Sequence, residues 1–234
     1  MALNPQFKTF TLRPPKAPNL PIAPVDYTQQ YQDQVLNALR LYFNQIDNFS
    51  LPLTQQNGGS YLQFPFISAS DTAIQYATAA NTPTIVKWNV LELGSGFTLN
   101  ANYTATAQFA GIYKITYSLQ FANNDNAAHD SIVWLRVNGL TSANDVPDSS
   151  TIFTVPARKS AGVPSYVAGY SEVVFELNAG DSVGLWWGTT QAATSGGATG
   201  NYIYYQAAQT TPMAYPVTPS AIGSITFVSA LYWW

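Results

Sequence analysis

From about residue 84 onward, apolar and polar residues alternate with a period of two. In residues 111–121, GIYKITYSLQF, every second side chain is aromatic or aliphatic, and polar side chains mostly occupy the positions between. Successive side chains of an extended strand point to opposite faces, so this pattern is typical of a strand that buries one face and exposes the other. The sequence therefore predicts a mainly β domain over this region.

The same alternation returns in later segments that are separated by turn signals. Residues 131–137, SIVWLRV, are followed by Asn138-Gly139, a tight-turn dipeptide. Residues 171–177 and 182–188 are strand-like on either side of a second turn. Together with TIVKWNV, FTLNANYTATAQF, STIFTV and SITFVSALYW, the count is about eight strands, which predicts an antiparallel sandwich or jelly roll over residues 84–234.

The first 26 residues are rich in proline, which fixes φ and removes a backbone donor. This segment can therefore be neither a helix nor a central strand. Two interpretations remain open, a disordered tail or an extended arm that lies along a neighbouring subunit. Apolar side chains along the segment favour the arm, and three of them are predicted to bind a partner: Phe7, Phe10 and Leu12.

An amphipathic helix is predicted over residues 27–49, with Asp26 as its cap. Four apolar side chains recur at intervals of three and four, which is the spacing of a coiled coil. They are Leu36, Leu39, Phe43 and Ile46. The helix either packs on its own domain or joins two other copies beneath a trimeric head, and the second option fits the rest of the chain better. Residues 50–83 are predicted to be a linker.

The composition narrows the range of functions. Only 9% of the residues are charged and 47% are hydrophobic, which favours a protein packed against copies of itself. The chain has no cysteine, which excludes disulfides, zinc–thiolate sites and cysteine nucleophiles. A net charge of −3 with scattered Lys and Arg argues against nucleic-acid binding, and no segment is apolar enough for a signal peptide or membrane insertion.

The sequence contains no recognisable catalytic or metal-binding motif. The single histidine, His129, lies in a polar loop, and Glu172 and Glu176 are too far apart along a strand to act as a glycosidase pair. The Asn-rich turn offers oxygen donors for calcium, but their spacing matches no EF-hand loop. Those donors are Asn123, Asn124, Asp125, Asn126 and Asp130. We therefore predict a non-enzymatic protein that needs neither a metal nor a cofactor.

Three segments resemble the jelly roll of the complement-C1q and tumour-necrosis-factor family. Residues 110–123, AGIYKITYSLQFAN, resemble its central strand, where a Gly-x-Tyr opening precedes alternating aromatic residues. Residues 173–187, VVFELNAGDSVGLWW, resemble two apolar strands joined by a Leu-x-x-Gly-Asp turn. Residues 220–231, SAIGSITFVSAL, resemble the closing strand. This resemblance implies a homotrimer whose aromatic-rich faces pack around a threefold axis.

The residues that this resemblance assigns to the trimer interface are aromatic, and the helix adds its four apolar residues to them. From the sandwich they are Tyr113, Tyr117, Phe121, Trp186, Tyr232, Trp233 and Trp234. The alternative is that several of these side chains fill the core of the protomer itself.

The helical segment YTQQYQDQVLNALRLYFNQIDN resembles the N-terminal helix of small structural proteins from tailed bacteriophages. The expected function is a virion component, a decoration, cement or head-fibre protein that binds other virion proteins such as the capsid, neck or tail proteins. The alternative is a tail or collar fibre that binds a host surface glycan or receptor. A long insertion over residues 188–219 would supply that contact through Tyr202, Tyr204, Tyr205 and Tyr215.

Overall fold

The computed structural model describes residues 15–22, 25–26, 28–54, 64–194 and 199–230. The chain forms two compact units, Met1–Gln63 and Phe64–Trp234. The β unit therefore begins well before the start predicted at residue 84. Phe7, Phe10, Leu12 and the three C-terminal aromatic residues Tyr232, Trp233 and Trp234 lie outside the described residues, so their predicted roles stay predictions.

The helical unit contains α1, which spans Gln29–Thr54. The prediction of a helix here is confirmed, but α1 continues five residues past the end predicted at residue 49. Its cap is Thr28 rather than Asp26, because the Thr28 hydroxyl accepts a hydrogen bond of 3.3 Å from the backbone N–H of Tyr31. A hydroxyl in this position satisfies one of the N–H groups that the first helical turn leaves without a partner.

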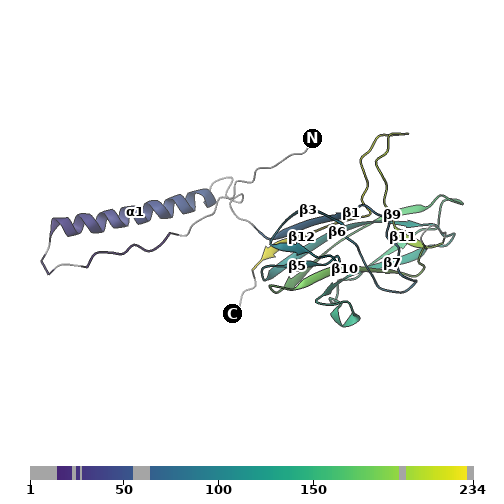
Figure 1. The fold of residues 1–234 in the computed structure, drawn as a ribbon, viewed down its shortest axis with the longest axis horizontal. Coiled ribbons are helices and arrows are strands. Elements are labelled where there is room, and N and C mark those ends of the chain that lie inside the picture. The colour runs from purple at the N-terminus through teal and green to yellow at the C-terminus, as the bar shows by residue number, and fades with distance from the viewer. Residues whose placement is uncertain (1–14, 23–24, 27, 55–63, 195–198, 231–234) are drawn as a thin grey trace. The chain divides into compact units, whose positions relative to one another are not determined.

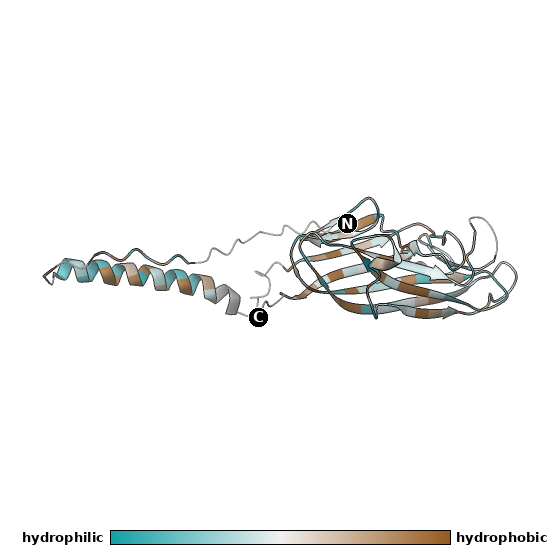
Figure 2. Ribbon diagram, turned by 90° about the horizontal axis from the view of Figure 1, so that it is seen from below, coloured by the Kyte–Doolittle hydropathy of each residue, from teal (hydrophilic) through white to brown (hydrophobic). Residues whose placement is uncertain are grey.

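Residues 15–22, which we call the arm, run beside α1 and antiparallel to it in both views (Figures 1 and 2). Pro15, Pro18 and Pro21 are half-buried, whereas most residues between them are exposed. This spacing of three is the repeat of a polyproline II helix, so the prolines share one face. The half-buried positions of α1 also share a face: Tyr31, Val35, Ala38, Leu39, Tyr42, Ile46 and Phe49. The described part of the arm thus lies along its own helix, and the predicted contact with a neighbouring subunit stays a prediction.

The second unit is a sandwich of two six-stranded antiparallel sheets, A and B (Figure 1). Sheet A contains β1 Phe66–Asp71, β3 Val90–Ser95, β6 Gly111–Asn123, β9 Ser165–Leu177, β11 Asn201–Ile203 and β12 Ala221–Ser229. Sheet B contains β2 Thr84–Ile85, β4 Phe97–Leu99, β5 Ala105–Ala107, β7 His129–Val137, β8 Thr151–Val155 and β10 Ser182–Thr189. The prediction of an antiparallel sandwich is confirmed.

β6 organises sheet A because strands pair with both of its edges. β9 pairs with all of β6 on one edge, while β12 and β11 share the other edge. β12 in turn pairs with β1, and β1 with β3. In sheet B the order is β4-β5-β10-β7-β8, with β2 also on β10. The chain crosses from one sheet to the other after β1, β2, β3, β5, β6, β8, β9 and β10, so strands far apart in sequence become neighbours.

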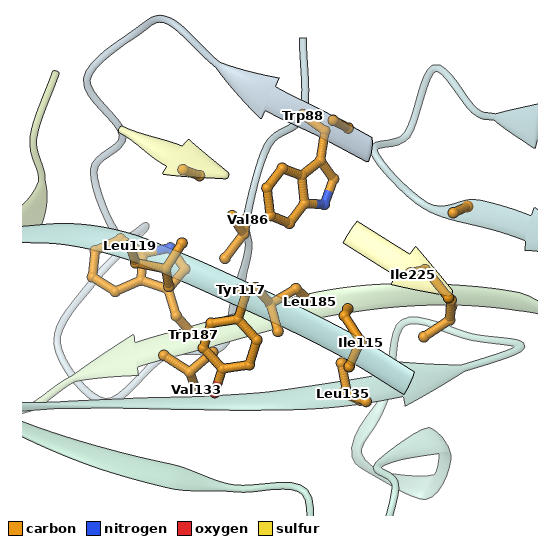
Figure 3. Close-up of a cluster of buried hydrophobic side chains, with 14 of the residues drawn as sticks. Val86, Trp88, Ile115, Tyr117, Leu119, Val133, Leu135, Leu185, Trp187 and Ile225 are labelled. Atoms are coloured by element: carbon orange, nitrogen blue, oxygen red, sulfur yellow. The ribbon is translucent and has the colours of Figure 1, made fainter. Parts of the chain in front are cut away.

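The core lies between the sheets and takes alternate residues of each long strand (Figure 3). The inward side chains of β6 are Tyr113, Ile115, Tyr117, Leu119 and Phe121, and all are buried. They meet a second layer from β7 and β10. Its largest members are Val133, Leu135, Leu185 and Trp187.

The prediction that Tyr113, Tyr117 and Phe121 form a trimer interface is therefore wrong. Each of these side chains is enclosed within one chain, and none presents surface to a neighbouring copy. Their ring contacts are made inside the sandwich, as for Phe121 with Trp187 at 6.0 Å and Tyr113 with Phe97 at 5.2 Å. The alternative noted from the sequence, that these residues fill the protomer's own core, is the one that the structure shows.

Candidate functional site

The outer face of sheet A, which we call face A, is an open β surface that carries several exposed apolar side chains. The strand registers place its side chains in rows that cross β1, β12, β6 and β9. The first row is Ser70, Ile222, Ser118 and Tyr170; the second is Ser68, Ser224, Thr116 and Glu172; the third is Phe66, Thr226, Lys114 and Val174. Small hydroxyl side chains fill its centre, and exposed apolar side chains surround them.

Charges on face A are few and largely compensated. Lys114 Nζ lies 3.5 Å from Glu172 Oε2, and both side chains are partly exposed. An exposed pair of this kind contributes only about 0–1 kcal/mol to stability. Its effect here is on the surface potential, because it leaves the middle of face A without a net charge. Glu176, at the end of β9, is a further exposed acid on this side.

The outer face of sheet B is different because the chain covers part of it. Arg136, on β7, is only 4% exposed and is held by the loop that follows its strand. Its Nε donates to Asp145 Oδ1 at 2.5 Å, and its Nη1 donates to the carbonyl oxygen of Leu140 at 2.5 Å. Its guanidinium carbon lies 4.2 Å from the ring centre of Trp186 and 5.6 Å from that of Trp134.

Trp186 was predicted at the trimer interface, and the structure places it beneath this loop. Its side chain faces away from the core, as predicted for an interface residue, but it is buried under Arg136. It therefore offers little surface to another chain. Nothing in the alternation of β10 indicates this cover, because it comes from residues 138–149, which the sequence marks only as a turn.

Four tyrosines form a continuous strip near the end of sheet A where β11 pairs with β6. The ring centres of Tyr76 and Tyr202 are 5.8 Å apart, those of Tyr202 and Tyr204 6.2 Å, and those of Tyr204 and Tyr166 4.9 Å. Of the tyrosines predicted to bind a partner, Tyr202 is buried, whereas Tyr204, Tyr205 and Tyr215 are half-buried. Tyr76 and Tyr166 also belong to this strip, although no pattern in the sequence selects either residue.

Burial, with a smaller effect from the adjacent Tyr166, raises the pKa of Tyr202 to about 12. Burial and Tyr166 likewise raise the pKa of Tyr204 to about 12. In the unfolded chain a tyrosine titrates near pH 10. Both side chains therefore favour the neutral form in the folded state.

We expect the free energy of unfolding to fall as the pH rises from about 10 to about 12, because the unfolded chain releases these protons first. Below pH ~10 this contribution is fully present. Urea unfolding at neutral pH and at about pH 11 measures the loss. The double substitution Tyr202→Phe with Tyr204→Phe should reduce the difference between the two pH values; an unchanged difference would contradict this assignment.

The Asn-rich turn after β6 is held by hydrogen bonds within the protein. His129 Nε2 lies 2.6 Å from Asp125 Oδ2, and this hydrogen bond lowers the pKa of Asp125. Asp130 Oδ1 accepts a hydrogen bond from the Thr154 hydroxyl. The side-chain amide of Asn123 donates to backbone carbonyls. Within the described ranges, no group of three or more His, Asp or Glu side chains is placed to hold a metal ion.

Comparison with models of known protein families and with curated protein sequences found no match for this chain. No helix in the described part of the chain is long and apolar enough to cross a bilayer. The class that the structure defines is a β-sandwich of two antiparallel sheets with one N-terminal helix. The resemblances noted in the sequence to a jelly-roll family and to bacteriophage proteins remain predictions.

Proposed function

We propose that this chain is a non-enzymatic structural component of a bacteriophage virion, a homotrimeric decoration, cement or head-fibre protein. The observation that carries the proposal is the contrast between the two outer faces of the sandwich. Face A is open and the middle of it carries no net charge, whereas residues 138–149 cover part of sheet B. A surface with exposed apolar side chains and little charge is suited to contact with another protein.

The strand order supports the finer description of the sandwich as a jelly roll of the C1q and tumour-necrosis-factor type. Sheet A has the order β9-β6-β12-β1-β3 and sheet B the order β4-β5-β10-β7-β8. In a jelly roll, eight strands divide between two sheets by repeated crossing, so that the closing strand lies beside the first. β12 lies between β6 and β1 in this manner. This is a likeness of topology, and it is an analogy with respect to function.

Face A is the surface through which the sandwiches of three copies would pack. Ile222, Tyr170 and Val174 are exposed on it, and the Lys114–Glu172 pair brings no uncompensated charge to its centre. Burying each apolar side chain of this size stabilises an assembly by about 1.5–3 kcal/mol. These residues replace the buried aromatic side chains of β6 in the predicted interface.

The copy number of this protein in purified particles tests the proposal. Quantitative mass spectrometry against the major shell protein should find an abundance comparable to that of the shell protein, as expected for decoration or cement. A small multiple of three per particle would instead support the alternative, a tail or collar fibre whose tyrosine strip contacts a host glycan or receptor. Absence from the particle would overturn both virion functions.

A further inference from the structure

α1 carries two neighbouring apolar stripes, and the described residues cover one of them more fully than the other. The covered stripe consists of the positions beneath the arm, namely Tyr31, Val35, Ala38, Tyr42 and Phe49. The second stripe, which we call the open stripe, consists of Leu36, Leu39, Phe43 and Ile46. Both stripes follow intervals of three and four, so each runs straight along the helix.

The arm leaves the outer margin of the open stripe uncovered. Leu39 and Ile46 border the covered stripe and are half-buried, but Leu36 is 53% and Phe43 58% exposed. In proteins most of the stability of a helix comes from the packing of its apolar face. The arm covers one stripe of α1. A second contact, on the open stripe, would bury the rest of the apolar surface of the helix.

The two edges of the open stripe differ in charge. Asp33, Arg40 and Asp47 follow one another along the edge away from the arm, which gives that edge a net negative charge. The arm forms the other edge, and Lys16 is its only charged residue. When identical units are arranged around a rotation axis, the same two unlike edges meet at every contact. The acidic edge of one copy then faces the basic edge of the next, which favours a further copy of this chain over an unrelated partner.

We propose that the open stripe joins the helices of three copies into a bundle in which each arm lies on the outside, against its own helix. The inference rests on the proposed trimer and adds a second contact to the one at face A. In this arrangement the arm shields the covered stripe from other chains. Each helix then has a single apolar surface, the open stripe, through which it can pack on another helix. Leu36 and Phe43 lie closest to the threefold axis.

The absence of cysteine allows a direct test in the full-length protein. Leu36→Cys or Phe43→Cys places one thiol per chain on the open stripe. Under mild oxidation each variant should form an interchain disulfide. Three thiols around one axis can make only one bond, so about two of every three chains should appear as covalent dimers on a non-reducing gel. Cross-linking of nearly all chains would indicate a twofold pair and would overturn the threefold bundle.

Leu41→Cys is the matched control. Leu41 is also an exposed leucine of α1, 63% exposed, but it lies about 140° around the helix from Leu36. It should cross-link much more slowly than the two open-stripe variants, and equal rates would overturn the inference.

The molar mass of the unmodified chain, measured by light scattering, separates this inference from the proposed function. A trimer whose open-stripe thiols cross-link no faster than the control would refute the bundle and leave the trimer standing. A monomer would refute the trimer itself.

Discussion

Replacing Ile222 by glutamate is expected to convert the proposed trimer into monomers at micromolar concentration. Ile222 lies on β12 in the middle of face A and is 44% exposed in the single chain. Each trimer would gain three carboxylates in surfaces that become desolvated on assembly. The effective penalty for burying an unpaired charge is several kcal/mol per ion, enough to remove most of the affinity of an ordinary interface. Light scattering or native mass spectrometry after gel filtration measures the change.

Ile152→Glu is the matched control for this experiment. Ile152 is an isoleucine on β8 of sheet B that is 65% exposed, and it does not lie on face A. This variant should remain trimeric. Near-ultraviolet circular dichroism should show that the core aromatic residues keep their packing in both variants. If Ile222→Glu forms a trimer that resists dilution as well as the unmodified chain does, with an intact sandwich, face A is not one of the contacts that hold the copies together.

Replacing Arg136 by alanine should lower the free energy of unfolding by roughly 2–4 kcal/mol. The substitution removes the ion pair with Asp145, the hydrogen bond to Leu140 and the contacts with two tryptophan rings. It also leaves a hollow against Trp186, which the guanidinium now covers. Asp145 is partly exposed, so water can solvate it in the variant, and the loss therefore stays below that for two fully buried ions.

Urea unfolding followed by tryptophan fluorescence measures this loss. Arg136→Lys keeps the charge but cannot stack a planar guanidinium on Trp186, so it should recover only part of the stability. Lys114→Ala, which breaks the exposed pair on face A, should change the free energy of unfolding by less than about 1 kcal/mol. A loss for Arg136→Ala no larger than that for Lys114→Ala would contradict the structural role of the loop.

The long strands were predictable because their alternation extends over many residues. β6, β7 and β9 follow the expected period. Asn138 has a positive φ of 59° where β7 ends, but a long loop to β8 at Thr151 follows instead of the predicted tight turn. β1 was missed and placed in a linker. Its buried residues include Ser70 and Asp71, whose side chains hydrogen-bond to Glu92 and to the backbone of Ala73. Buried polar residues with partners in distant segments cannot be recognised from a local hydrophobic pattern.

The predicted trimer interface on β6 shows more clearly what strand alternation alone cannot predict. Alternation in residues 111–121 indicates which side chains share a face of the strand, but not which face another part of the chain will cover. The aromatic face became the core, and the face with Lys114, Thr116 and Ser118 became the open surface. On α1 the four predicted coiled-coil positions do share a side of the helix, yet the packing of the arm next to them could not be read from the spacing alone.

The position of β12 has a consequence for the order of events during folding. This strand lies closest to the C-terminal end of the described chain, yet it is inserted between β1 and β6, both made much earlier. Sheet A therefore cannot close until synthesis has passed Ser229, and its pairings must form over long separations in the sequence, which slows folding. An incomplete chain would lack the strand that joins β1 to β6. In the proposed assembly, the strand order would therefore exclude chains that do not extend through β12.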